Sequence, residues 1–361
     1  MSIKEKTTDF INKHETKLDI AFFVGGFLFD ILFISAPDDL FSIVQQAVYL
    51  FIVATLIHYE MLFRLHKWRP KESLLKLWSY RDFTLHFFLG SLLSVYSLFY
   101  IKSASILSSF IFLILLIAII LLNELSFAKS GKVSLKVAFY AICLFSFFSV
   151  IYPIILGFVG WTPLFFSVLS TVLILLGQFK LLARSEVPGK ILTKALAAPA
   201  GAVLSIFLLF YFLGWIPPVP LSVTAQGVYH NLEKREGQFF LSFEKTWKFW
   251  QDSDKEFNAA PGDKVFFFAQ IYSPARISDQ IFLHWHLKNK KGDWVSTDRV
   301  PLFIQGGRKE GFRGYATKAN YQPGEWMVTV ETSMGSEISR YYFEISTVAA
   351  NEARIFTTLE K

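Results

Sequence analysis

Four ionisable side chains stand near the ends of long apolar runs in the first half of the chain: His58, Glu60, His86 and Glu124. Ionisable groups inside a bilayer are costly, so each of them is a candidate functional residue. Two imidazoles and two carboxylates at one level of a membrane could relay protons, bind a cation or hold a lipid headgroup. The alternative is that these side chains lie within one or two turns of the interface and are hydrated or snorkel to water.

Asp30 differs from these four, because it lies about twelve residues into an apolar run that begins near residue 18. A carboxylate at that depth needs a partner. Its functional interpretation is a proton or cation site. Its structural interpretation, which we favour, is an interhelical hydrogen bond to Gln45 or Gln46 of the next run.

Two tryptophans in the second half of the chain, Trp247 and Trp250, lie in the sequence WKFW within a long connection. Exposed rings at such a position could stack on a sugar face or rest in a membrane interface, so we take them as candidate ligand-binding aromatics. The alternative is that they cover the end of the domain's core.

His284 and His286 alternate on one face of a predicted strand, with Trp285 on the other face. This spacing could supply two imidazoles to one metal ion, but the sequence offers neither a cysteine nor an acidic partner at a recognisable spacing. We therefore predict a solvated strand face, no metal site and no cofactor. The common hydrolase, nucleotide and metalloprotease motifs are absent from any supporting context, so no catalytic residue is assigned.

The composition identifies the class of protein that must hold these residues. A mean hydropathy of +0.41 with 53% hydrophobic residues is too apolar for an ordinary water-soluble chain. Residues 1–217 hold 18 basic and 12 acidic residues, whereas residues 218–361 hold 18 and 17. The excess of positive charge therefore belongs to the apolar half, which argues against nucleic acid as a partner. The single cysteine, Cys143, excludes an intrachain disulfide.

A helix needs about 20 apolar residues to cross the hydrocarbon layer, and seven runs approach that length. They are 18–36, 40–63, 83–101, 106–127, 137–158, 161–183 and 195–217. The first run is longer than a typical signal-peptide core, and Pro37 follows its only small-residue site, so we expect it to remain as an anchor.

The orientation of the helices in the membrane follows from the distribution of lysine and arginine, because short cytoplasmic loops carry an excess of these residues. With the N-terminus inside, the inner segments hold 17 of these residues and the outer loops hold only Lys102. Seven spans then place the C-terminal half outside. The prediction is a cytoplasmic tail at 1–17, a seven-helix membrane domain at 18–217 and an exported domain at 218–361.

The exported half changes from continuous apolar runs to short alternating ones separated by turn residues. Eight strands are predicted, at 221–230, 237–245, 263–273, 279–287, 299–304, 311–318, 325–333 and 338–346. This pattern is typical of an antiparallel all-β sandwich, and we prefer an immunoglobulin-like form of it. On the strand at 325–333 we expect Trp326, Val328 and Val330 to face the core and Met327, Thr329 and Glu331 to face outward.

The stretch from Ile281 to Ser346 contains HWHLKNKKGDW, VPLFIQGGRKEGFRGYATK and QPGEWMVTVET. It resembles the domain-of-unknown-function family 2914, a bacterial envelope domain. The membrane half, with FFVGGFLFD and FFLGSLLSVYSLFYIKSAS, resembles the long members of that family, which join a multi-span region to this domain. The resemblance implies architecture and a bacterial inner membrane with the C-terminal domain in the periplasm. It implies no activity and no site residues.

Two functional hypotheses follow. The leading one is a non-enzymatic envelope protein whose membrane helices, in contact with lipid, anchor a periplasmic module that binds a protein or glycan partner. The alternative is a membrane enzyme or transporter that acts on a lipid-linked or ionic substrate through the cytoplasmic-face histidine and glutamate cluster.

Overall fold

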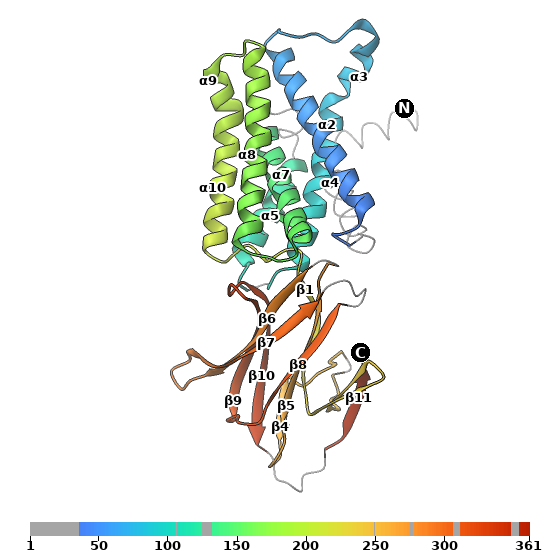
Figure 1. Cartoon of the computed structure of the whole chain (residues 1–361), viewed down its shortest axis with the longest axis vertical. Helices are drawn as coiled ribbons and strands as arrows, with labels where there is room; N and C mark the ends of the chain where they lie inside the picture. The colour runs from blue at the N-terminus through green and yellow to red at the C-terminus, as the bar shows by residue number, and fades with distance from the viewer. Residues whose placement is uncertain are drawn as a thin grey trace, which may run out of the picture. The chain divides into compact units, whose positions relative to one another are not determined.

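The computed structural model describes residues 36–105, 107–124, 132–248, 250–274, 277–305, 311–347 and 354–361. The chain divides into two compact units (Figure 1). The first contains the described residues up to Ile101 together with those of Ser109–Pro153 and Trp161–Ile216. The second contains Pro217–Lys361 with two short segments, Lys102–Ser108 and Ile154–Gly160.

The first unit is helical. Its elements are α2 (Leu40–Arg64), a 3-10 turn (Glu72–Leu74), α3 (Leu75–Ser79), α4 (Arg81–Lys102), α5 (Phe110–Glu124), α7 (Val133–Leu156), α8 (Trp161–Arg184), α9 (Gly189–Leu192), a π-helical turn (Thr193–Ala197) and α10 (Ala198–Phe212). Helix α2 begins at an N-cap, because the Asp39 carboxylate accepts the Ser42 N–H at 2.9 Å. The helix that ends at Phe212 is followed by Gly214 with a φ of +69°, a backbone conformation that glycine adopts at helix ends without steric cost.

Five helical stretches among the described residues are long and apolar enough to cross a membrane. They are Leu40–Arg64, Arg81–Lys102, Val133–Leu156, Trp161–Arg184 and Gly189–Phe212, and Phe110–Ile119 is a shorter apolar helix. Six of the seven predicted spans thus coincide with apolar helices, one of them short. The remaining span, 18–36, lies outside the described residues except for Ala36, so the count of seven stays a prediction.

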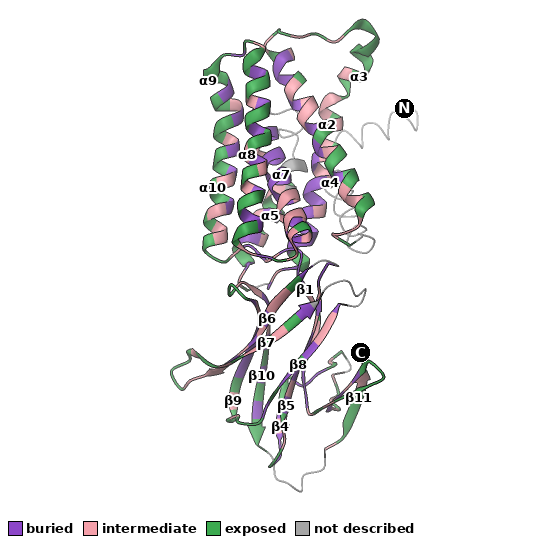
Figure 2. Ribbon diagram, viewed as in Figure 1, coloured by how far each residue is buried: buried purple, intermediate pink, exposed green. Residues whose placement is uncertain are grey.

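The five long helices differ in how far the unit buries them. In α4 and α7, just over half of the residues of the apolar stretch are buried inside the unit. In α2, only about a fifth of these residues are buried. Helices α8 and α10 run side by side and present many exposed apolar residues (Figure 2). Apolar surface that no protein covers is what contact with lipid requires. The helical unit therefore has the surface of a membrane protein.

The second unit is all β. Its strands are β1 (Ser222–Tyr229), β2 (Asn231–Arg235), β3 (Gln238–Glu244), β4 (Glu256–Ala259), β5 (Val265–Tyr272), β6 (Ser278–Lys288), β7 (Trp294–Gln305), β8 (Phe312–Lys318), β9 (Gly324–Thr332), β10 (Glu337–Thr347) and β11 (Phe356–Glu360). All eight predicted strands are present. Three further strands, β2, β4 and β11, were not predicted.

The strands form three sheets, in the orders β1-β5-β8, β4-β10-β9-β6-β7 and β11-β3-β2. Every pair is antiparallel except β4 with β10, which is parallel, so the expectation of a wholly antiparallel domain was wrong. Strand β4 lies between the long connection after β3 and the turn before β5. It reaches the edge of the large sheet beside the last half of β10, where Glu256 pairs with Glu344.

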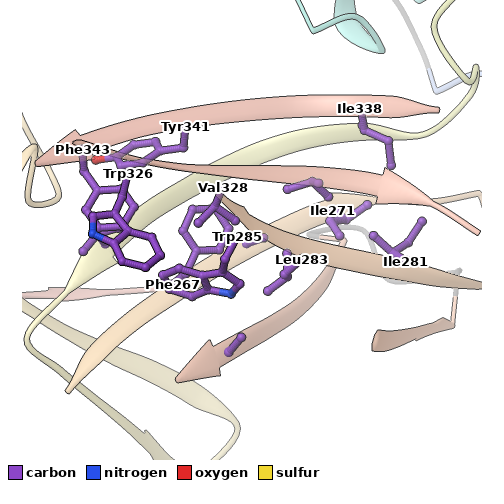
Figure 3. Packing of buried hydrophobic residues seen from close by; sticks show 14 of the residues in the cluster. Phe267, Ile271, Ile281, Leu283, Trp285, Trp326, Val328, Ile338, Tyr341 and Phe343 are labelled. Atoms are coloured by element: carbon purple, nitrogen blue, oxygen red, sulfur yellow. The ribbon is translucent and has the colours of Figure 1, made fainter. Parts of the chain in front are cut away.

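The core lies between the three-stranded sheet of β1, β5 and β8 and the five-stranded sheet. Phe267 of β5 packs edge-on against Trp285 of β6, with ring centroids 6.1 Å apart, and Trp285 meets Trp326 of β9 at 6.4 Å (Figure 3). All three side chains are buried. Large aromatic rings in such edge-to-face contacts contribute strongly to core stability.

Strand β9 departs from the expected alternation. Trp326, Val328 and Val330 face the core, as predicted, but Met327 and Thr329 are buried as well. Strand β9 is central in its sheet, so the side chains of its neighbours β6 and β10 cover the outer face. His286 and Tyr342 flank Met327 in the strand register. An outward-facing residue on a central strand is therefore not necessarily an exposed one.

We expect Phe267→Ala to lower the free energy of unfolding of the β unit by about 3–5 kcal/mol, because it leaves a cavity against Trp285. The matched control is Phe303→Ala, since the Phe303 side chain is 73% exposed and should cost less than about 0.5 kcal/mol. Chemical denaturation of the purified chain, followed by hydrogen exchange of β5 and β6, measures the difference. Equal losses for the two variants would contradict this account of the core.

Candidate functional site

A buried charge cluster joins three helices of the helical unit. Glu60 of α2 is fully buried, and Lys136 of α7 donates from Nζ to its two carboxylate oxygens at 2.9 and 2.8 Å. The same Nζ donates to Asp82 of α4 at 2.5 Å. Arg64, one turn after Glu60, donates to Glu60 Oε1 from Nε at 2.9 Å and from Nη2 at 2.6 Å. One lysine thus ties α2, α4 and α7 together.

The geometry limits what Glu60 can do. Both of its oxygens accept hydrogen bonds from the side chains of Arg64 or Lys136, so neither oxygen is left without a partner for a substrate or ion to replace. Paired burial is how a charge is tolerated in an apolar setting. The cluster is therefore built as a structural crosslink, and proton transfer through it would require Lys136 to move away.

Sequence reasoning placed Lys136 in a cytoplasmic loop and so missed it. Helix α7 begins at Val133, four residues before the predicted start at 137. That extension puts Lys136 in the first helical turn, where its side chain enters the unit. Asp82 was missed for the same reason, because α4 begins at Arg81, two residues before the predicted 83.

The other predicted polar residues have different surroundings. His58 is half-buried, and its ring meets that of Tyr59 at 5.5 Å. His86 is also half-buried, on α4. Glu124 is the last residue of α5, and its side chain lies outside the described part of the structure, as does all of Asp30. Glu60 is hydrogen-bonded to Arg64 and Lys136, neither of which belonged to the predicted histidine and glutamate cluster.

In the β unit, the loop after β3 presents two exposed indoles. The Trp247 side chain is 79% exposed and that of Trp250 is 62% exposed, and their rings meet edge to face at 5.6 Å. They do not cover the core, so that alternative was wrong. The loop is anchored on one side by the Lys245 N–H, which donates to the Ile355 carbonyl at 2.8 Å, and on the other by the Asp254 N–H, which donates to the Val228 carbonyl at 2.9 Å.

A histidine and aspartate pair, which the sequence analysis missed, stabilises the far end of this loop. His230 Nδ1 lies 3.0 Å from Asp254 Oδ2, and His230 Nε2 lies 3.2 Å from the Asn258 carbonyl. A carbonyl only accepts, so Nε2 carries a proton and cannot act as a base. Burial raises the pKa of the Asp254 carboxyl above its usual value, against the opposing effect of His230. The neighbouring hydroxyl of Ser253 is hydrogen-bonded to the Tyr341 hydroxyl at 2.9 Å, so it is not positioned as a nucleophile for this pair. The role of the His230 and Asp254 pair is therefore structural.

His284 and His286 lie side by side on β6, with ring centroids 4.0 Å apart. This strand face has an acidic partner that sequence spacing did not reveal: Glu331 of β9 lies 3.1 Å from His284 Nδ1. Burial, followed by the neighbouring His284, lowers the pKa of His286. Among the residues that the structure describes, no group of three or more His, Cys, Asp or Glu side chains could hold a metal ion.

Comparison with known proteins gives one family match. Residues 278–345 match the family model described as protein of unknown function (DUF2914). The matched segment runs from β6 to near the end of β10 and includes His284, His286 and Glu331. The exposed Trp247 and Trp250 lie before it. No curated protein matches the chain.

Solved structures add loose similarities. An immunoglobulin-like protein from Pseudomonas aeruginosa is 14% identical, and the alignment covers 32% of this chain and 97% of that one with a TM-score of 0.20. A β-glucosidase from Listeria innocua in complex with gluconolactone is 15% identical over 30% of this chain and 16% of that one, with a TM-score of 0.19. TM-scores of this size support no argument about topology or function.

Arg354 fastens the last described strand to the β unit. Its Nη1 donates to Asp263 Oδ2 at 2.5 Å and to the Asn258 carbonyl at 2.9 Å, two residues before β11 begins. Burial raises the pKa of Asp263, but the bonds from Arg354 and from the Ala260 N–H lower it by more, so the net pKa lies below its usual value.

We expect Lys136→Met to destabilise the helical unit by about 3–5 kcal/mol, because it removes one of the two cations paired with the buried Glu60 and also breaks the pair with the partly exposed Asp82. Thermal unfolding of the purified chain in detergent measures this loss. The matched control is Lys132→Met at an exposed position one turn earlier. The double variant Glu60→Gln with Lys136→Met should lose less than the two single variants together. A Lys136→Met variant as stable as Lys132→Met would show that the cluster is not a crosslink.

We expect strand β11 to loosen in acid. Because the folded-state pKa of Asp263 is the lower one, its pair with Arg354 stabilises fully above the ordinary aspartate pKa of about 4 and loses that stabilisation as the pH falls through the lowered value. Hydrogen-exchange protection of 356–360 should therefore fall between pH 6 and pH 3 more in the wild type than in Asp263→Asn. Asp293→Asn, in an exposed turn, is the control and should follow the wild type. Identical pH profiles for all three chains would rule out this role of the pair.

Proposed function

We propose that this chain is a seven-helix protein of a bacterial inner membrane that anchors a periplasmic recognition module of immunoglobulin-like form. The five apolar helices long enough to span a bilayer support the anchoring role. The distribution of lysine and arginine supports a cytoplasmic N-terminus and, with seven spans, an exported C-terminal domain. Membrane lipid is then one partner and a periplasmic glycan or protein is the other.

The observation that carries the proposal is the exposed pair Trp247 and Trp250. An isolated exposed aromatic is ordinary, but two adjacent indoles held on an anchored loop present a large apolar surface to solvent. Tryptophan is enriched among residues that dominate binding energy, and its flat face also suits the apolar face of a sugar. If a ligand covered the two indoles, their apolar surface would be removed from water, and this burial would contribute favourable free energy to binding.

The competing function is a membrane enzyme or transporter acting through His58, Glu60, His86 and Glu124. It needs a carboxylate free to take up a proton, a cation or a substrate group. Glu60 instead accepts hydrogen bonds from Arg64 and Lys136. This pairing favours the anchor over the enzyme or transporter, and it is consistent with the missing catalytic motifs.

The test is binding of the purified full chain, in detergent, to fractionated periplasmic glycans and proteins. We expect one fraction to bind saturably and both Trp247→Ala and Trp250→Ala to weaken binding by at least about tenfold. Trp294→Ala is the matched control, because Trp294 is also partly exposed on the β unit but lies on β7. A glycan fraction and a protein fraction are distinguished by glycosidase or protease treatment of the fraction.

Two outcomes would contradict the proposal. One is a folded wild-type chain that binds no fraction. The other is a Trp294→Ala variant that loses as much affinity as the two loop variants, since the effect would then not belong to the exposed pair.

A further inference from the structure

The connection between α2 and α4 folds into a layer of aromatic rings at the end of the helical unit. The Trp68 ring lies 5.0 Å from that of Trp78, and the Phe63 ring lies 5.6 Å from that of Trp78. Arg81 completes the layer, with its guanidinium carbon 5.4 Å from the Phe63 ring and 5.3 Å from the Trp78 ring. We call Phe63, Trp68, Trp78 and Arg81 the aromatic–basic cap.

Two of the three nitrogen positions of the Arg81 guanidinium are engaged. Nη1 donates to the Trp78 carbonyl at 3.2 Å, and Nη2 lies 3.3 Å from Asp82 Oδ2. These contacts fix the plane of the guanidinium beside the Trp78 indole. The other oxygen of Asp82 accepts from Lys136 at 2.5 Å, so both oxygens of this carboxylate have cationic partners.

Two N–H donors of the cap have no acceptor among the residues that the structure describes. They are Arg81 Nε and Trp78 Nε1, and both are shielded from solvent. A buried donor without a partner costs about 1–3 kcal/mol, and more if the group is charged. The two donors belong to neighbouring side chains, since the Arg81 guanidinium carbon lies 5.3 Å from the centre of the Trp78 ring. An acceptor that entered the cap would relieve this cost.

The charge around the cap selects the acceptor. From Arg64 to Asp82 the chain carries six basic residues and only two acidic ones, Glu72 and Asp82. Two N–H donors cannot bind a cation. Three of the six basic residues already have acidic partners, since Arg64 pairs with Glu60, Lys67 with Glu186 and Arg81 with Asp82, but basic residues still outnumber acidic ones in this segment and favour an anionic acceptor. A phosphate group supplies several acceptor oxygens and negative charge together, and charge-assisted bonds from arginine to phosphate are among the strong ones.

We propose that the aromatic–basic cap binds a phosphate group, carried either by a membrane lipid headgroup or by a free phosphate. Helices α2 and α4 are both long enough to span a bilayer, so the segment that joins them lies where lipid headgroups are found. Trp78 Nε1 and Arg81 Nε supply the hydrogen bonds to phosphate, and Trp68 and Phe63 keep the two side chains in place. This site is independent of the recognition role proposed for Trp247 and Trp250.

The test is lipid retention by the purified full chain, measured by native mass spectrometry. The probes are phosphatidylglycerol, diacylglycerol with the same acyl chains, and inorganic phosphate. We expect phosphatidylglycerol to be retained at least about fivefold more than diacylglycerol. Trp78→Phe, which removes the indole donor but keeps an aromatic ring, should abolish most of that preference. Trp68→Phe is the matched control and should retain the preference. Arg81→Lys keeps the positive charge but lacks Nε–H, and it serves if Trp78→Phe lowers the thermal stability of the chain.

Each outcome decides the proposal. Loss of the phosphatidylglycerol preference in Trp78→Phe or Arg81→Lys, but not in Trp68→Phe, supports a lipid phosphate. Displacement of that lipid by millimolar inorganic phosphate supports a free phosphate at the same donors. Equal retention of phosphatidylglycerol and diacylglycerol, together with no retention of inorganic phosphate by the wild-type chain, overturns the proposal. An effect of Trp68→Phe equal to that of Trp78→Phe overturns it too.

Discussion

The helical unit depends on the pairing of one buried lysine. Within the described part of the chain, Lys136 of α7 forms ion pairs with Glu60 of α2 and with Asp82 of α4, both at hydrogen-bond distance. One lysine thus links three helices through charge. In an apolar setting each of these charges would be expensive alone, so their positions constrain one another. The three helices can shift only as far as the lysine side chain can follow. The more exposed helices, such as α8 and α10, are free of that constraint and present apolar residues outward.

The β unit is stabilised differently from the helical unit, because polar groups on its surface can be hydrated. Its core is apolar and built on Phe267, Trp285 and Trp326. Its buried polar groups sit at the margins and bind the long connections to the sheets, as His230 does with Asp254. Such networks rigidify a structure when every member is satisfied. They hold the loop after β3, and in β11 they add to the packing of Leu359 against a second apolar cluster that includes Phe239, Leu241 and Phe243 of β3.

Local patterns in the sequence predicted where most strands lie, but not which strands pair with one another. Eight strands followed from alternation and turn residues, because side chains on a pleated strand repeat every two residues. The strands β2, β4 and β11 are short or carry few apolar residues, so they gave no such pattern. Their positions depend on pairing with distant segments: β4 lies parallel to β10, and β11 pairs with β3 across more than a hundred residues.

The candidate site residues show the same contrast between local features, which the sequence reveals, and distant partners, which it does not. Trp247 and Trp250 could be singled out from the sequence, since two indoles in a polar connection are unusual in themselves. The partner of His284 could not, because Glu331 follows 47 residues later and becomes its neighbour only through the register of β6 with β9. Lys136 was misplaced by a helix start that differed by four residues, an error of the usual size for element boundaries.

The energetic case for recognition rests on how the exposed indoles are held. Ordering a loop on binding consumes part of the interaction free energy, and a loop that is already fixed avoids that loss. The loop with Trp247 and Trp250 is hydrogen-bonded at Lys245 on one side and at Asp254 on the other. Its two indoles also contact each other edge to face, which limits their rotation. The anchored ends and the contact between the two indoles therefore lower the ordering cost of binding, which leaves more of the free energy of covering this surface available for affinity.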